Sequence, residues 1–308
     1  MKRTIGLLLA LVMLLSLTAC GMEPESSEPE TSTGAAPTEA SEAPVTEAPT
    51  EAPKTVYAME NDAIVDNDSC AFTVTKVTSD QVYGMALEVL CENKTDKTLM
   101  FSWDMVSVCG IMYDPFWAQE VAPNEQAAST IYIDMLTLAE YGIPSVDEIT
   151  FHLNIFDNEK WLDEAFVNDE FTIYPTGLTA GTVTYPERQS KEGETVIVDN
   201  ENLTFIIESV DSADPWQYTL QCYLVNKTDK NVMFSWDMVS VNGCSIDPAW
   251  AVTATAGKAA YSTISFYTSE LEENGIEVVE DIEFTMIVSD YDDWNANYIL
   301  DSVYTYHP

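Results

Sequence analysis

Apolar and polar residues alternate with a period of two over much of the chain beyond residue 64, and this pattern predicts short β-strands. Strands are expected at 70–77, 83–92, 98–108, 128–133, 149–156 and 171–174. Residues 136–142 instead suit one or two helical turns closed by Gly142. Because the pattern contains no long amphipathic helix, we predict an all-β antiparallel sandwich rather than an α/β fold.

The strand predicted at 98–108 cannot keep a single alternation along its length. Its apolar positions switch from odd to even numbers between Trp103 and Val106. One extra residue in the strand would return both sets to the same face. We therefore predict a β-bulge near Asp104-Met105, and a second near Asp237-Met238.

An internal repeat organises the rest of the chain. Met100–Val108 (MFSWDMVSV) recurs as Met233–Val241, at an offset of 133 residues. Within 93–108, 14 of 16 positions are identical to their counterparts. Solenoid repeats are much shorter, so this period predicts tandem globular domains with one short helical turn each. The expected boundaries are 55–175 for the first domain, 176–196 for a connector and 197–308 for the second domain.

The motifs in each repeat carry a resemblance. The run NKTDK-x-x-MFSWDMVSV, then DP-x-W-A, then a Leu-x-Glu-x-Gly-Ile turn resembles a family of lipoproteins from anaerobic Gram-positive bacteria. Those proteins carry immunoglobulin-like domains of unknown function and are similar in fold to the mycobacterial immunoprotective extracellular proteins. The resemblance implies two immunoglobulin-like domains and a cell-envelope location, and it implies no catalytic residue.

The N-terminus has the pattern of a secretory signal. Lys2 and Arg3 precede an apolar run, 5–17, that is too short to span a bilayer. The run ends in Leu-Thr-Ala-Cys-Gly, which resembles a bacterial lipobox with Cys20 as the lipidated mature N-terminus. An ordinary signal with an incidental cysteine is the alternative. We expect a signal peptide at 1–19 and acyl chains, including palmitate, that hold Cys20 on the extracytoplasmic face of the cell membrane.

Residues 20–54 are rich in Glu, Pro, Ser, Thr and Ala and contain no aromatic residue. Such a segment buries too little apolar surface to offset its chain entropy, so we predict a disordered tether. Its simplest role is to hold the folded domains away from the membrane. Whether the tether is glycosylated is left open by its composition.

Charge narrows the classes of partner. The chain has 12 basic and 52 acidic residues, a formal net charge of −40. Nucleic-acid binding is excluded because phosphate recognition requires clustered Lys and Arg. Cations and neutral ligands remain the more plausible partners.

Catalysis finds little support in the residue types. The two histidines, His152 and His307, have no histidine counterpart in the other repeat. Nucleophilic catalysis by Ser or Cys requires a histidine positioned as general base, and no such histidine recurs. We therefore predict that the protein is not an enzyme. Two alternatives stay open. One is an enzyme, a carboxylate-dependent glycan hydrolase, and the other is a purely structural surface spacer.

Five cysteines follow Cys20, and none is matched by a cysteine in the other repeat. A disulfide framework would recur in pairs, so we expect mostly buried free thiols. A single bond between Cys222 and Cys244 is left open.

Acidic loops raise the question of calcium. The loop after the strand predicted at 149–156 and the equivalent loop of the second repeat carry carboxylates, whose oxygen atoms are ligands suited to Ca²⁺. An acidic, solvated turn explains the same residues. The candidate calcium ligands are Asp157, Asp290, Asp292 and Asp293.

The sharpest candidate for binding is a recurring set of tryptophans and aspartates. Exposed tryptophan beside carboxylates can stack on a sugar or anchor a protein, so the expected ligand is a glycan or an envelope protein. A core role is the alternative; it is favoured for the two tryptophans on predicted strands, whereas those beside Asp-Pro turns fit either role. The set comprises Trp103, Asp104, Asp114 and Trp117, with counterparts Trp236, Asp237, Asp247 and Trp250; Trp161 likewise recurs as Trp294. We predict a non-enzymatic binding, adhesion or envelope accessory protein, whose oligomeric state is not fixed by these patterns.

Overall fold

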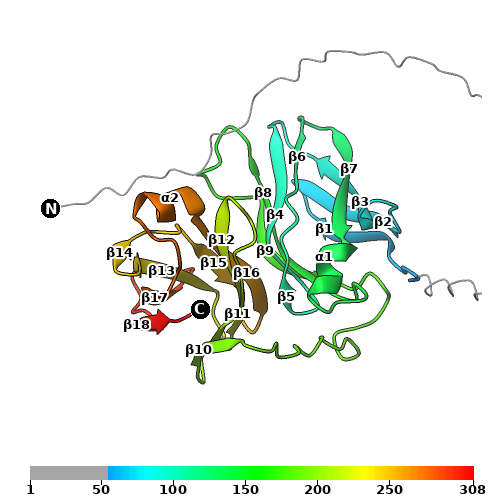
Figure 1. The fold of residues 1–308 in the computed structure, drawn as a ribbon. Helices are drawn as coiled ribbons and strands as arrows, with labels where there is room; N and C mark the ends of the chain where they lie inside the picture. Colours follow the sequence, from blue (N-terminus) through cyan, green and yellow to red (C-terminus); the bar gives the residue numbers. More distant parts are fainter. Residues whose placement is uncertain (1–54) are drawn as a thin grey trace, which may run out of the picture. The chain divides into compact units, whose positions relative to one another are not determined.

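The computed structural model describes residues 55–308 (Figure 1). The predicted signal peptide 1–19, the lipidated Cys20 and the tether 20–54 lie outside the described residues. Within 55–308 the chain forms strands and two helices of six residues each. In this part of the chain, neither helix has the length and apolar content that crossing a membrane requires.

The first repeat forms two sheets that face each other. One has the order β1-β2-β3-β7; in the other, β4 pairs with β5, β6 and β8, and β8 pairs with β9. The strands of this repeat pair antiparallel. The elements are β1 (Glu60–Asp66), β2 (Cys70–Thr78), β3 (Gly84–Asn93), β4 (Leu99–Val108), β5 (Ile111–Met112), β6 (Ala118–Val121), β7 (Gln126–Asp134), α1 (Met135–Glu140), β8 (Ile149–Asp157) and β9 (Val167–Ile173).

The second repeat has the same topology. One sheet has the order β10-β11-β12-β16; in the other, β13 pairs with β14, β15 and β17, and β17 pairs with β18. Its elements are β10 (Thr195–Asp199), β11 (Leu203–Asp211), β12 (Gln217–Asn226), β13 (Val232–Val241), β14 (Cys244–Ser245), β15 (Ala251–Ala254), β16 (Ala259–Tyr267), α2 (Thr268–Glu273), β17 (Ile282–Asp290) and β18 (Leu300–Tyr306).

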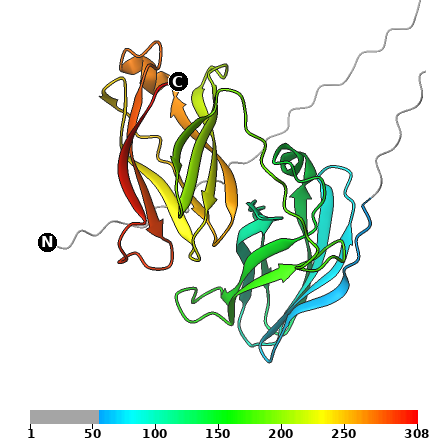
Figure 2. The ribbon, with the colours of Figure 1, turned by 90° about the horizontal axis from the view of Figure 1, so that it is seen from below.

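The two repeats therefore match element by element. From β2 and β11 onward, each strand and helix begins 133 residues after its counterpart. Strand β10 begins at Thr195, two residues inside the segment 176–196 that was expected to be a connector. Figure 2 shows the two layers within each repeat. The predicted all-β fold class, two tandem antiparallel β-sandwiches with one short helix each, is confirmed.

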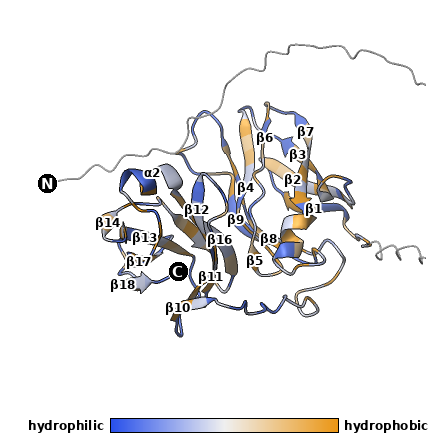
Figure 3. Ribbon diagram, in the orientation of Figure 1, coloured by the Kyte–Doolittle hydropathy of each residue, from blue (hydrophilic) through white to orange (hydrophobic). Residues whose placement is uncertain are grey.

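Each sandwich is held by an aromatic cluster between its sheets. In the first repeat the ring centroid of Trp117 lies 5.6 Å from that of Phe72 and 6.1 Å from that of Trp103, and Trp103 lies 5.2 Å from Phe151. The four counterparts form the same cluster in the second repeat. The strands carry both hydrophobic and hydrophilic residues (Figure 3), because one face of each sheet packs in the core and the other faces outward. Burial of such large rings is a main contribution to the stability of each sandwich.

The repeated NKTDK motif has a structural role. Nδ2 of Asn93 donates to the carbonyl oxygens of Lys97, Val121 and Ala122, and Oδ1 accepts from the backbone N–H and hydroxyl of Thr95. This buried amide therefore ties the β3–β4 turn to the end of β6. Burial also leaves the amide no room for a glycan, although the sequence matches a glycosylation sequon.

The predicted β-bulges are confirmed in both repeats. Between the pairs Asp104–His152 and Ser107–Thr150, β4 advances three residues while β8 advances two. The same shift separates Asp237 from Ser240 in β13. Because of the extra residue, apolar side chains on both sides of the bulge point into the core.

The two repeats contact each other through β5 and β16. Ala259 pairs with Ile111 in a single parallel bridge, and its N–H donates to the carbonyl of Gly110 at 3.0 Å. Gly110 has φ of +83°, and a Cβ there would meet the ring of Tyr185 from the connector at 2.7 Å. Both the positive φ and the close approach of the Tyr185 ring therefore require glycine at position 110.

Charged side chains add a second tie between the repeats. Glu148 of the first repeat is buried; it accepts a hydrogen bond from the Tyr185 hydroxyl at 2.6 Å and lies 3.6 Å from Lys258 Nζ of the second repeat. The Lys258 ammonium also lies 5.3 Å from the Tyr185 ring centroid. A buried carboxylate is thus compensated by one cation and one hydroxyl drawn from two other parts of the chain.

The cysteines between residues 55 and 308 are free thiols. Four are buried, namely Cys70, Cys91, Cys109 and Cys222, which confirms the prediction for most of them. Burial raises the pKa of Cys91 to about 12, so its thiol stays protonated at neutral pH. Cys222 and Cys244, whose pairing the sequence left open, are not bonded to each other.

Candidate functional site

The four recurring tryptophans are core residues. Trp103, Trp117, Trp236 and Trp250 are all at least 92% buried. Nε1 of Trp117 donates to Ser129 Oγ at 3.1 Å, and Nε1 of Trp250 donates to Ser262 Oγ at 2.9 Å. The core role favoured for Trp103 and Trp236 is confirmed, and Trp117 and Trp250, which fitted either role, are core residues too; their candidacy as ligand-binding residues is corrected. Their rings fill the space between the two sheets.

The aspartates of the second repeat close local turns. Asp237 Oδ1 accepts a hydrogen bond from the N–H of Met238, and Asp247 Oδ1 accepts one from the N–H of Ala249. Both residues are exposed. Neither residue lines the pocket that their counterparts Asp104 and Asp114 share in the first repeat.

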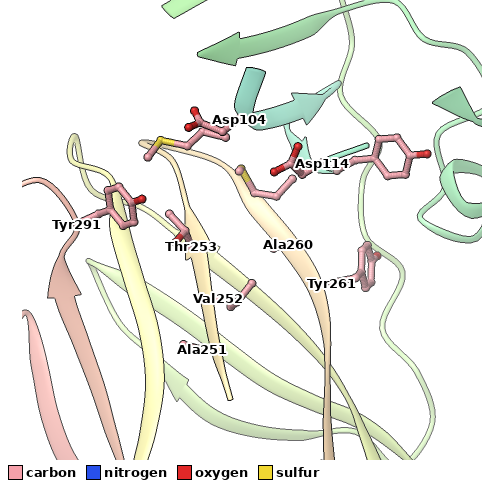
Figure 4. A pocket seen from close by; sticks show the side chains of 11 residues that line it. Asp104, Asp114, Ala251, Val252, Thr253, Ala260, Tyr261 and Tyr291 are labelled. Atoms are coloured by element: carbon pink, nitrogen blue, oxygen red, sulfur yellow. The ribbon is translucent and has the colours of Figure 1, made fainter. Parts of the chain in front are cut away.

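Asp104 and Asp114 of the first repeat do come together, in a pocket of about 380 Å³ between the two repeats. Figure 4 shows both carboxylates at this pocket, with Tyr291 on one flank and Tyr261 on the other. We call it the inter-repeat pocket. Its polar and aromatic lining comprises Asp104, Tyr113 and Asp114 from the first repeat and Thr253, Tyr261 and Tyr291 from the second.

The bulge in β4 places Asp104 at this pocket. Met105, the residue after it, has φ of 48°, a left-handed conformation that costs a non-glycine residue on the order of 1 kcal/mol. Met238 repeats this conformation in β13 with φ of 52°, but there the side chain is 80% exposed. In the first repeat, Met105 instead lies in the pocket wall beside the second repeat.

Asp104 also lines a second hollow, of about 760 Å³, on the first repeat itself. Trp161, from the β8–β9 loop, lines this hollow and has 59% of its surface exposed. We call this hollow the Trp161 pocket, and the two pockets together the Asp104 site. The other polar residues that line the Trp161 pocket are Ser102, Asn154, Asp163, Glu164, Asn168 and Asp169.

Asp104 has unusual partners. Its Oδ2 accepts a hydrogen bond from Asn154 Nδ2 at 3.1 Å. Its Oδ1 is buried and, among the described residues, has no hydrogen-bond partner, although His152 Nδ1 lies 3.5 Å away. Desolvation raises the pKa of Asp104, and the charge of His152 and the Asn154 hydrogen bond offset part of that rise.

The pKa values of Asp114 and Tyr291, which line the same pocket, are also raised. Desolvation and the charge of Asp104 raise the pKa of Asp114. Desolvation and the charge of Asp104 also raise the pKa of Tyr291, so its phenol stays protonated at neutral pH. Two carboxylates that repel each other beside neutral phenol rings form a site whose electrostatics a bound cation would relieve.

The candidate calcium ligands are already engaged. Asp157 pairs with Lys97 at 3.3 Å, and Asp290 pairs with Lys230 at 2.6 Å. Oδ1 of Asp290 also accepts from the N–H groups of Asp292 and Asp293. Residues 55–308 contain no group of three or more His, Cys, Asp or Glu arranged to hold a metal ion. The calcium prediction for Asp157, Asp290, Asp292 and Asp293 is corrected: these residues order a turn.

The sequence pointed to Asp104 and Asp114 and showed that Trp161 recurs as Trp294, but it did not separate these two exposed tryptophans from the buried ones. Trp161 and its counterpart Trp294 lie in equivalent loops, and Trp294 is 67% exposed, with its ring centroid 6.3 Å from that of Tyr291. The available signal was that both tryptophans fall between strands rather than within an alternating pattern. The tyrosines of the inter-repeat pocket had no sequence signal, because they converge from different repeats.

The comparisons with known proteins add the following. No protein-family model matches the chain, and no curated protein matches it. A solved structure that does match is the SafA pilin of Salmonella enterica in complex with the SafB chaperone, at 12% identity and a TM-score of 0.22. The match covers 80% of this chain and 100% of that chain. At this distance it does not bear on ligand or partners, and the fold assignment rests on the strand order described above.

Proposed function

We propose that the protein is a lipid-anchored, extracytoplasmic binding module that takes its ligand at the Asp104 site. The single observation that carries the proposal is that Asp104 lines two adjoining pockets flanked by exposed or partly exposed aromatic rings. Binding sites are concave and combine apolar walls with a few convergent polar groups, as these pockets do. Trp161 leaves much of its ring exposed at this pocket, where a sugar or an apolar group of a ligand could stack on it.

A non-enzymatic role is favoured over the glycan hydrolase. An acid pair requires one carboxyl that is protonated and one that is ionised. Here desolvation raises the pKa of both Asp104 and Asp114, and the charge of Asp104 also raises that of Asp114, so neither carboxyl is marked out as the ionised base. A purely structural spacer remains the competing function, and it requires neither pocket.

The binding role is tested with residues 21–308, screened against glycan and envelope-protein arrays. Trp161→Ala is expected to lower the signal of specific hits about tenfold or more, because one stacked aromatic contributes 1–3 kcal/mol at a typical site. Trp216→Ala removes another tryptophan, 75% exposed in the β11–β12 loop, and serves as the matched control. If no hit distinguishes the two variants, the spacer function is favoured and the Asp104 site is wrong.

The anchor is tested on the full-length chain. Cys20→Ala is expected to abolish palmitate labelling and to move the protein out of the membrane fraction, because the lipobox thiol carries the acyl chains. Cys244→Ala, which changes a partly exposed thiol of the second repeat, should keep both properties. Retention of Cys20→Ala in the membrane fraction would contradict lipid anchoring.

A further inference from the structure

We propose that the inter-repeat pocket binds an organic cation, an ammonium or guanidinium group of the ligand, between Asp104 and Asp114. This inference rests on the proposed function and names the chemistry that the Asp104 site selects. The pocket supplies what such a group needs, namely carboxylates to accept its N–H bonds and aromatic rings to face its charge. Its volume of about 380 Å³ admits a side-chain-sized group rather than a folded partner.

The two carboxylates of the pocket can accept more hydrogen bonds than the protein itself donates to them. Asp104 Oδ1 is buried without a hydrogen-bond partner among the described residues. Asp114 is exposed and accepts no hydrogen bond within 55–308, whereas its counterpart Asp247 accepts one from Ala249; the burial cost therefore applies to Asp104 Oδ1 alone. A buried carboxylate oxygen without a donor is costly. A donor brought in by a ligand removes that cost, and a cationic donor also removes the repulsion between the two aspartates.

No lysine or arginine competes for the pocket, although the His152 imidazole lies 3.5 Å from Asp104 Oδ1. Residues 55–308 contain 44 acidic and nine basic residues, and none of those nine lines either pocket of the Asp104 site. Elsewhere in the molecule the strongly buried carboxylates are paired, as Glu148 is with Lys258 and Glu208 is with Arg188. The pocket is thus a place where the chain leaves its own acidic side chains without a lysine or arginine.

The groups that line the pocket favour an organic cation over a metal ion. Within the described residues no three carboxylate, imidazole or thiolate groups converge on one point. The remaining walls are instead tyrosine rings from both repeats, at Tyr113, Tyr261 and Tyr291. Hard metal ions prefer several oxygen ligands, whereas alkylammonium and guanidinium groups gain from one or two carboxylates beside aromatic faces.

Titration calorimetry on residues 21–308 at low ionic strength tests the inference with two probes, a tri-arginine peptide and spermidine. We expect at least one of them to bind, with Asp114→Asn weakening that binding about tenfold or more because a charge-assisted hydrogen bond is lost. Asp247→Asn makes the same change in charge at the equivalent position outside the pocket, and it should leave the affinity unchanged. A tri-citrulline peptide, neutral but similar in shape, should bind at least about tenfold more weakly than tri-arginine.

The outcomes separate the sources of the cation. Binding of tri-arginine alone assigns the pocket to a guanidinium on a peptide, binding of spermidine alone assigns it to a polyamine, and binding of both supports the shared chemistry. Equal weakening by Asp114→Asn and Asp247→Asn would show attraction by net charge alone and would overturn the inference, as would the failure of both probes. If a neutral ligand binds in a Trp161-dependent manner while both cations fail, the proposed function survives and only the cation is wrong.

Discussion

Asn226→Ala is expected to destabilise the second repeat by about 3 kcal/mol or more. Nδ2 of Asn226 donates to the carbonyl oxygens of Lys230, Ala254 and Thr255, and Oδ1 accepts from the N–H and hydroxyl of Thr228. The side chain is fully buried. Truncation leaves several backbone groups without partners where water enters poorly, at a cost of 1–3 kcal/mol for each group that stays unsatisfied.

Chemical denaturation measures this loss, and hydrogen exchange assigns it to the end of β12 and to β15. For a chain of this size the melting temperature should fall by about 6–12 °C. Asn93→Ala should do the same in the first repeat, because its amide makes the equivalent bonds. Asp229→Ala changes an exposed residue of the same turn and should cost under about 0.5 kcal/mol. Similar losses for Asn226→Ala and Asp229→Ala would contradict the structural role of the motif.

Arg188→Met is expected to destabilise the protein by about 3 kcal/mol, because it leaves a buried carboxylate short of a cation. Glu208 is 2% exposed; it accepts hydrogen bonds from Arg188 Nε at 2.9 Å and from Lys191 Nζ at 2.6 Å. Arg188 also pairs with Glu194 and lies over the ring of Tyr223. Removal of the guanidinium therefore breaks the main link between the connector and β11.

A double-mutant cycle and a pH series check this prediction. Arg188→Met/Glu208→Met should recover most of the loss, because apolar replacement of a buried pair is close to neutral. The Arg188 hydrogen bond also lowers the pKa of Glu194, so this pair stabilises the fold above the ordinary glutamate pKa and loses that effect as pH falls through the lowered value. Arg188→Met should remove that acid-side dependence. An unchanged pH profile, or a double variant no better than Arg188→Met, would contradict the assignment.

Local sequence pattern predicted the fold because the properties concerned are local. Strand alternation, the offset between repeats and the shift of apolar positions around Asp104 each reflect which face of a strand enters a core. The bulges follow directly, since one face of a period-two strand can be kept through Val106 only by inserting a residue. The roles of the tryptophans were less accessible, because an aromatic beside an Asp-Pro turn fits a core or a surface equally well until the opposite sheet is in place.

Contacts between residues far apart in the chain divide the features that the sequence predicted from those that depend on packing. The sequence determined the fold class and the presence of carboxylates and aromatic rings at equivalent places in two repeats. Only the tertiary structure decided that Asp157 and Asp290 pair with lysines of the NKTDK turns, and that Asp104 and Asp114 meet tyrosines of the other repeat while Asp237 and Asp247 do not. The physical reason is that a side chain's partners depend on the packing of sheets and repeats far apart in the chain. Two nearly identical motifs therefore give one pocket and one solvated turn.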